Sequence, residues 1–344
     1  MPEPYHNDDI KELVIRVPMK RLSSVQWWKS QKIDVVVLYS WAKPEYILVA
    51  RAIHKAGIRL VLHLDMGRAY PPLWDKSISS ICKRSFVFCR RVAADLARSK
   101  HMRYADIITA TKIIQEEIRN RRFYGDAVAD KFFECPTMIA SHFKYEGQVK
   151  ESTIVTCANW TAGNGVKRPE FLMACVDVLL QREQFAASKI EIYGKPTKQM
   201  LAWHEGLSAE ERKRVRMYGF INNEDLVDIN ARAQISLCFS RHESLHIASL
   251  EALCSGCSIV VANRERLRIV RSYTENGCGS VTKEDTPESM AEAILDELAE
   301  WKAGARNPMD ISRYWQNKCS ACYVIPRILR APCKISTESK YNPE

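Results

Sequence analysis

The sequence lacks the features that define several large classes of protein. It has no apolar run near the roughly 18 consecutive residues that a membrane-spanning helix requires. Its N-terminus has neither a basic leader nor the apolar core of a signal peptide. No G-x-G-x-x-G follows a strand-like segment and no P-loop occurs, which argues against a dinucleotide-dependent dehydrogenase. We therefore expect a soluble, cytoplasmic chain.

The 12 cysteines suit the same reducing compartment, because most lie inside apolar runs where a free cysteine behaves as a small buried hydrophobe. Two C-x-x-C pairs, Cys254/Cys257 and Cys319/Cys322, formally permit a zinc site. The separation between the pairs far exceeds the usual zinc-ribbon spacing. Packing is therefore the favoured interpretation of both pairs, and we expect no bound metal.

Positive charge is concentrated in the first half of the chain. Residues 1–150 contain 26 Lys and Arg against 16 Asp and Glu, whereas the remaining residues contain 25 of each. The basic clusters lie at 83–84, 90–91, 98–103 and 119–122, and Trp27-Trp28-Lys29 adds an aromatic neighbour. Such a surface attracts anionic membrane, polyphosphate or nucleic acid, although any single cluster also suits a solubilising face.

Strand-like apolar runs alternate with helical segments through most of the sequence. The expected strands are 33–39, 58–64, 105–110, 131–136, 153–158, 189–193, 214–218, 233–239 and 257–262. The expected helices are 45–55, 76–100, 112–122, 169–182, 224–232, 247–254 and 288–302. Strands separated by helices of about ten or more residues indicate parallel, doubly wound sheets, so the fold class is α/β.

A chain of 344 residues is long enough for two such domains. The polar run 142–152 is the best linker candidate. We predict a short, basic Rossmann-like domain over 1–148 and a second Rossmann-like domain over 149–320. The residues 321–344 form a tail that we expect to pack back on the first domain.

Two carboxylates separated by seven residues, Glu243 and Glu251, outline a candidate site. Glu243 follows an expected strand, and Glu251 lies about two turns into a helix that begins near His246 or Ile247. The free N–H groups and the positive dipole end of that helix face the same pocket. An anion and a polyhydroxyl group would be held together there, although two glutamates at this spacing also occur on ordinary solvated surfaces.

The segment around these carboxylates resembles the E-x7-E signature of retaining glycosyltransferases of the GT-B fold, particularly family 4. Ala252, Gly256 and the expected strand 258–261 fit the sequence that follows the second glutamate in that family. The resemblance implies that Glu243 contacts the donor sugar and Glu251 the ribose of the nucleotide. It also places the donor against Ser244, Leu245, His246 and Ile247. Family members most often have glycine where Ser244 and His246 stand.

Further positions carry the same resemblance over most of 33–302. The resemblance places Gly194 at the end of a strand near the nucleotide, and Tyr218 and Gly219 beside the base. Lys167 and Arg168 are candidates for the cation that offsets the charge of the diphosphate, with a solvated helix start as the alternative. His63, at the end of an expected strand, matches a histidine beside the donor sugar. A lone histidine is otherwise more often structural.

The resemblance implies two Rossmann-like domains facing a central cleft and a retaining, metal-independent glycosyltransferase. It would use a nucleotide sugar as donor substrate, with no cofactor, and a glycan, lipid or protein as acceptor. A role in cell-surface glycan or glycolipid biosynthesis, with peripheral contact to the inner face of an anionic membrane, fits the basic first half.

Two other functions stay open at this stage. Family members commonly have a Gly-Arg pair after the first strand of the second domain, where this chain has Ala158-Asn159. A catalytically idle GT-B relative acting as a partner subunit would explain this missing pair and the short first domain, in which Leu13–Val17 is a candidate first strand. A nucleic-acid-binding protein would explain the basic half, but no recognisable module or interleaved aromatics support it. We therefore expect no nucleic-acid partner.

Overall fold

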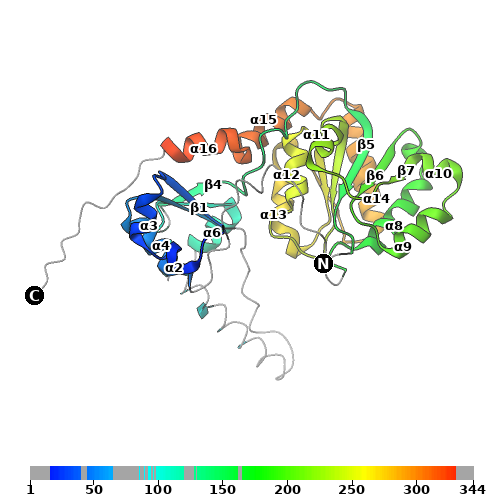
Figure 1. The fold of residues 1–344 in the computed structure, drawn as a ribbon. Coiled ribbons are helices and arrows are strands. Elements are labelled where there is room, and N and C mark those ends of the chain that lie inside the picture. Colours follow the sequence, from blue (N-terminus) through cyan, green and yellow to red (C-terminus); the bar gives the residue numbers. More distant parts are fainter. Residues whose placement is uncertain are drawn as a thin grey trace, which may run out of the picture.

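The computed structural model describes residues 16–39, 45–64, 98–119, 130–161 and 165–330, with isolated positions between 85 and 96 and Val128. The described chain forms two parallel sheets, which Figure 1 shows as separate α/β units. This confirms the predicted α/β class with two parallel sheets. The predicted helix 76–100 and the basic clusters at 83–84, 90–91 and 121–122 lie largely outside the described residues.

The first sheet has four strands in the order β1-β2-β3-β4, all parallel. Its strands are β1 (Val35–Leu38), β2 (Arg59–His63), β3 (Ile107–Ala110) and β4 (Phe132–Glu134). The helices of this unit are α2 (Met19–Leu22), α3 (Val25–Ser30), α4 (Tyr46–Lys55) and α6 (Lys112–Arg119). Helix α4 ends before Gly57, whose φ of 78° is a conformation that glycine adopts without strain. Arg16 and Val17, the described part of 13–17, belong to no strand.

The N-terminal tryptophans are part of the core of this unit. Trp28 is 6% exposed, and its indole N–H donates to the carbonyl of Leu22 at 2.6 Å. Trp27 stacks edge-on against it with ring centroids 4.7 Å apart. Trp28 is therefore not available as the surface aromatic beside Lys29 that the sequence suggested.

The second sheet has six parallel strands in the order β10-β9-β8-β5-β6-β7. Its strands are β5 (Glu151–Cys157), β6 (Lys189–Tyr193), β7 (Val215–Met217), β8 (Ala233–Cys238), β9 (Ser258–Val261) and β10 (Gly279–Val281). The strand order reverses between β5 and β8, so a topological switch point lies at their carboxyl ends. Ligands of open α/β sheets bind outside such a point.

Helices connect or follow these strands, and most of them bury apolar residues in the core of this unit. They are α8 (Pro169–Leu180), α9 (Lys198–Gly206), α10 (Ala209–Arg214), α11 (Asn223–Arg232), α12 (Ile247–Cys254), α13 (Arg268–Arg271), α14 (Pro287–Lys302) and α15 (Pro308–Cys319). Short 3-10 helices lie at Glu183–Phe185, Glu265–Leu267 and Ser272–Gly277. Side-chain caps fix several helix starts; the side-chain Oδ1 of Asn222, for example, accepts from the Asp225 backbone N–H at 2.7 Å ahead of α11.

The last described helix, α16 (Ala321–Arg330), returns to the first sheet, as Figure 1 shows. Val324 and Ile328 pack in one buried cluster with Val61 and Ile107 of that sheet. The guanidinium of Arg59 donates to the Ile328 carbonyl at 2.9 Å. Residues four apart lie on one face of a helix, so the spacing of Val324 and Ile328 suits this contact.

Candidate functional site

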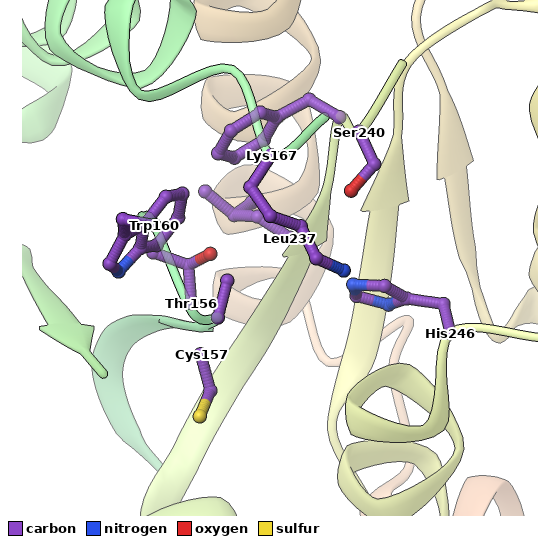
Figure 2. A pocket seen from close by; sticks show the side chains of 9 residues that line it. Thr156, Cys157, Trp160, Lys167, Leu237, Ser240 and His246 are labelled. Atoms are coloured by element: carbon purple, nitrogen blue, oxygen red, sulfur yellow. The ribbon is translucent and has the colours of Figure 1, made fainter. Parts of the chain in front are cut away.

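A pocket lies at the switch point of the second sheet, between the carboxyl ends of β5 and β8. It is lined by Thr156, Cys157, Ala158, Trp160, Lys167, Leu237, Phe239, Ser240 and His246, of which Figure 2 labels seven. Three chain segments therefore build it: the end of β5 with the loop toward α8, the end of β8, and the start of α12. This is the position where an open α/β sheet holds a ligand.

Lys167 and Glu243 form an ion pair at this pocket. The Lys167 Nζ lies 2.5 Å from the Glu243 Oε1, with 22% and 15% of the two side chains exposed. Burial raises the pKa of Glu243, but its interactions with His246 and Lys167, together with hydrogen bonds from Lys167 and Ser240, outweigh that effect and leave the pKa below its usual value. Glu243 is thus a carboxylate at neutral pH, and the ion pair is partly shielded from water.

His246 is the N-cap residue of α12 and occupies the left-handed region with φ 48°. Its Nδ1 lies 2.7 Å from the Ser249 Oγ, which fixes the orientation of the ring. Burial lowers the pKa of His246 to about 4, Glu243 opposes this effect and Lys167 adds to it. The ring is therefore neutral at physiological pH, and Lys167 is the cation that balances Glu243.

Glu251 lies on the second turn of α12. Burial raises its pKa to about 7. The thiol of Cys157, which lines the pocket, has a pKa raised by burial and, to a smaller extent, by the charge of Glu251. A carboxylate that titrates near neutrality beside a pocket is a candidate ligand-binding group. Both glutamates of the motif thus lie next to the switch point, together with Lys167 and His246.

The other residues of the Glu243–Ile247 segment take different positions. Leu245 is 5% exposed and packs in the core, so it can meet a ligand only through its backbone. Ser244 is exposed, and Ile247, the first residue of α12, is 54% exposed. The side chains of this segment therefore divide between core and surface.

Gly194 and Gly219 meet where the strands β6 and β7 end. The Gly194 N–H donates to the Gly219 carbonyl at 3.0 Å. Gly194 has φ 102°, and a Cβ there would collide with the carbonyl of Ala158, so only glycine fits. Tyr218 stacks on Tyr193 with centroids 4.8 Å apart and planes 7° apart, and it remains 38% exposed. This gives a flat aromatic surface beside the end of β6.

Arg168, in contrast to Lys167, is not among the residues that line the pocket. Its guanidinium pairs with Asp285 at 2.6 Å, donates to the Phe239 carbonyl at 3.2 Å and lies 3.8 Å from the centre of the Phe171 ring. Arg264 also pairs with Asp285. Arg168 therefore joins the loop before α8 to the loop before α14, and Lys167 alone of the predicted cation pair lines the pocket.

His63 ends β2 of the first sheet and is 3% exposed. Its Nδ1 lies 3.0 Å from the Thr109 Oγ1 on the neighbouring strand β3, and its ring lies 4.8 Å from that of Tyr39. The strand-end position matches the sequence prediction. The tyrosine and threonine hold the imidazole in one orientation.

Several pocket residues were not predicted from the sequence. Trp160 is buried, and its indole N–H donates to the Tyr193 carbonyl at 2.9 Å, joining the loop after β5 to the end of β6. Cys157, Phe239 and Ser240 come from the carboxyl ends of two strands that were predicted. Their position in the sequence could have identified these residues, because the residues that end β5 and β8 lie at the switch point.

The two C-x-x-C pairs do not converge as four ligands. The Cys254 Sγ lies 3.4 Å from the Cys319 Sγ in the core, whereas Cys257 contacts the Lys150 Nζ and Cys322 is exposed. Within the described part of the chain, no group of three or more His, Cys, Asp or Glu could hold a metal ion. The contact of Cys254 with Cys319 instead packs α12 against α15.

Solved structures with the same architecture place the fold in the GT-B class. Anabaena HepE in complex with UDP and glucose is 15% identical, with a TM-score of 0.54 over 95% of this chain and 83% of that chain. The pneumococcal O-GlcNAc transferase GtfA, in complex with UDP and GlcNAc, is 12% identical, with a TM-score of 0.51 over 89% and 60%. Sucrose-phosphate synthase from Thermosynechococcus elongatus is 16% identical, with a TM-score of 0.50 over 89% and 76%.

The family comparison concerns the second sheet and its helices. Residues 151–300 match the model of the family described as Glycosyl transferases group 1. This stretch contains β5 to β10, the residues that line the pocket, and both glutamates of the motif. The sequence resemblance to GT-B glycosyltransferases is thus confirmed. No curated protein matches the sequence. Among the described helices, none is long and apolar enough to cross a membrane.

Proposed function

We propose that the protein is a retaining glycosyltransferase that transfers a sugar from a nucleotide-sugar donor to an acceptor hydroxyl. The observation that carries this proposal is that Lys167 lines a pocket at the switch point and is paired there with Glu243, in a stretch that matches the group 1 glycosyltransferase model. Glu251 lies near enough to the pocket residue Cys157 to influence its thiol. A cation, a partly buried carboxylate and a second carboxyl near its titration point are the groups needed to hold a diphosphate, a sugar and a ribose.

Each group has a distinct task in the proposed reaction. Lys167 and the N–H groups at the start of α12 bind the diphosphate and stabilise the negative charge that develops as it leaves. Glu251 accepts hydrogen bonds from the ribose, and Glu243 accepts them from the transferred sugar. The acceptor hydroxyl attacks the anomeric carbon from the side of the leaving group, so the configuration is retained. The positive charge comes from the chain itself, and we propose that no metal ion is needed.

The first sheet supplies the other wall of the proposed site. His63, held by Thr109 and Tyr39, would face the donor sugar from the carboxyl end of β2. Tyr218 offers a stacking surface for the base beside Gly219. UDP is the first nucleotide to test, because HepE and GtfA were solved with UDP.

The idle-subunit alternative gains no support from the site. A relative without activity would have no need to keep a cation, two carboxylates and a strand-end histidine at the ends of the strands. The missing arginine of the Gly-Arg pair is the main departure, and His246 stands nearby as a further group that can carry positive charge. Transfer activity therefore remains the function that the geometry supports best.

The test is a ligand screen followed by one substitution. UDP-, GDP-, ADP- and dTDP-sugars are added separately, and the melting temperature is followed. One nucleotide class should raise it, since a bound ligand stabilises the folded state. Calorimetry with the matching nucleoside diphosphate should then show affinity tens of fold weaker in Glu251→Ala, the equivalent of about 2–3 kcal/mol. An unchanged melting temperature with every donor would contradict the proposal.

We also propose that the acceptor lies at an anionic membrane surface. Residues 16–32 contain five basic residues and no acidic residue, and Arg16, Lys20, Arg21, Lys29 and Lys32 are all exposed. Each basic residue near such a surface contributes about 1 kcal/mol, so this segment would give salt-sensitive attachment. Co-sedimentation with anionic vesicles, but not with neutral vesicles, should fall as salt is raised. Equal binding to both vesicles, or to neither, would contradict this part of the proposal.

A further inference from the structure

His246 combines an unusual backbone conformation with a titratable side chain at the pocket. A φ of 48° is uncommon for a residue with a Cβ, and it carries a backbone cost that glycine avoids. This costly backbone conformation occurs at a residue whose ring lines the pocket. A glycine at this position would offer a ligand only backbone groups, whereas the imidazole can also carry a proton and a charge.

The orientation of the ring is fixed by the helix that it caps. Nδ1 lies 2.7 Å from the Ser249 Oγ, and Ser249 is completely buried. Nε2 is the other ring nitrogen and is separate from this contact. Figure 2 shows the ring of His246 and the ammonium of Lys167 turned toward each other across the pocket. An anion bound to Lys167 would therefore also lie next to the imidazole.

The charged and titratable groups in and beside the pocket come from five segments of the chain. They are Lys167 from the loop before α8, Glu243 from the loop after β8, Glu251 on α12, and the thiols of Cys157 on β5 and Cys238 on β8. Lys167 is the nearby cation that disfavours a second positive charge on the ring. Glu243 favours that charge, but it is already paired with Lys167.

We propose, on the basis of the nucleotide-sugar site described above, that His246 takes up a proton when the donor binds and then donates a hydrogen bond to its diphosphate. The proton comes from solvent and forms an N–H bond on the imidazole; no other bond forms or breaks. The resulting imidazolium and the Lys167 ammonium then face two negative charges of the donor. His246 thus supplies part of the positive charge that the missing arginine would have given.

Electrostatics explains why binding changes the protonation of the ring. An opposite charge at about 4–6 Å moves a pKa by roughly 1 to 3 pH units in favour of the charged form. The diphosphate brings two such charges, and it also offsets the field of Lys167. Both effects raise the pKa of His246 from its low value in the free protein. The contribution of His246 to donor affinity should therefore be fully present below its pKa in the free protein, about 4, and should be lost as the pH rises from there through its pKa in the complex.

Glu251 would respond to the donor with the opposite sign. Ribose hydroxyls that donate to this carboxylate favour its ionised form, so the carboxyl releases a proton when the nucleotide binds. The net proton count of the wild-type protein therefore mixes two groups. The difference in proton count between the wild-type protein and a His246 variant isolates the histidine.

The experiment is calorimetric titration with the tightest binder among UDP-glucose, GDP-mannose, ADP-glucose and dTDP-glucose. Nucleotide sugars are used because their phosphates do not titrate near neutrality. Titrations near pH 6 in two buffers with different ionisation enthalpies give the number of protons bound. His246→Gly suits the positive φ, and His246→Asn keeps a polar side chain that also tolerates it. His242→Asn changes an exposed histidine four residues earlier in the same loop and is the matched control.

When the donor binds, the wild-type protein should take up at least about half a proton more per donor than either His246 variant. The reason is that the pKa of His246 in the complex then lies at or above the pH of the titration. His242→Asn should give the wild-type count. Equal proton counts in wild type and both His246 variants, with donor binding intact, would overturn this inference and leave the proposed function standing. Binding of none of the four donors by the wild-type protein would contradict both.

Discussion

Lys167 and Glu243 form an ion pair of 2.5 Å at the pocket in which we place the donor. The two residues come from loops that follow different strands, β5 and β8, so the pair joins the two sides of the switch point. In the proposed complex, Lys167 binds the diphosphate and Glu243 binds the sugar. When the donor binds, Lys167 and Glu243 must then give up their ion pair and contact the donor instead. The predictions for both residues follow from this competition.

Removal of the Glu243 carboxylate should separate catalysis from nucleotide binding. Glu243→Ala should lower turnover on the order of a hundredfold, because a contact to the transferred sugar is lost. Affinity for the free nucleoside diphosphate should stay the same or increase, since Lys167 is no longer paired. Single-turnover rates and calorimetry measure the two effects. Glu210→Ala, whose side chain is 80% exposed, is the control; a parallel loss of both quantities in Glu243→Ala would contradict the assignment.

Lys167 should be the main cationic contact to the diphosphate. Lys167→Ala should weaken binding of the nucleoside diphosphate by tens to hundreds of fold, the range expected for a hydrogen bond to a charged group. Lys198→Ala, an exposed lysine at the start of α9, should bind as the wild type does. In the double variant Lys167→Ala/Glu243→Ala, affinity should equal that of Lys167→Ala alone. Wild-type affinity in Lys167→Ala would exclude it from the site.

His63 should act on turnover from the first sheet. His63→Asn should lower turnover sharply and leave affinity for the nucleoside diphosphate nearly unchanged, since the residue is placed beside the sugar. Thr109→Val removes the partner of Nδ1 and keeps the imidazole, so it should give a smaller loss in turnover. Circular dichroism reports whether either variant remains folded. Wild-type turnover in folded His63→Asn would remove His63 from the mechanism.

The raised pKa of Glu251 has a consequence for stability. Burial raises this pKa from 4.5 to about 7 in the folded protein. The contribution of Glu251 to stability is therefore fully present below pH 4.5 and is lost as the pH rises through about 7. The loss is at most about 3 kcal/mol. Glu251→Gln should abolish it, so the variant should gain free energy of unfolding relative to wild type as the pH rises.

Urea denaturation of wild type and Glu251→Gln at about pH 5 and about pH 8.5 measures this gain. The exposed Glu210→Gln serves as the control, because its carboxyl is solvated in both the folded and the unfolded chain. A difference between wild type and Glu251→Gln that is the same at both pH values would contradict the burial of a titrating carboxyl at this position.

Arg168 should matter for stability and not for nucleotide binding. Arg168→Ala leaves the Phe239 carbonyl without this donor and removes one of the two arginines on Asp285. Breaking a partly buried pair of this kind should cost about 2–3 kcal/mol. Affinity for the nucleoside diphosphate should change little. Chemical denaturation and calorimetry test this prediction. Unchanged stability with a large loss of affinity would contradict it and indicate that Arg168 binds the nucleotide.

Much of the fold could be predicted because its strands are short apolar runs separated by helices. β6 was predicted with its observed bounds, and the other eight predicted strands differ by one or two residues at an end. The strand β10 was missed, since Gly279–Val281 is only three residues and begins with a glycine. That glycine is required because a Cβ there would collide with the backbone of Ile259, which no local pattern reveals.

The site could be predicted in part, for a different physical reason in each case. The spacing of Glu243 and Glu251 identified one loop and one helix, and both lie beside the observed pocket. Adjacency in sequence could not separate Lys167 from Arg168, because the partner of Arg168 is Asp285, far along the chain. The neutral state of His246 also depends on burial and on Lys167, which only the folded structure brings near.

The most direct test of the account is the release of nucleoside diphosphate from nucleotide sugars. The wild-type protein, Glu243→Ala and Glu210→Ala are each incubated with UDP-, GDP-, ADP- and dTDP-sugars, with and without a membrane extract as a source of acceptor. We expect the wild type and Glu210→Ala to release the nucleotide from one donor class, faster with the extract, and Glu243→Ala to release it on the order of a hundredfold more slowly. Absence of release from every donor, or equal release by wild type and Glu243→Ala, would contradict the account.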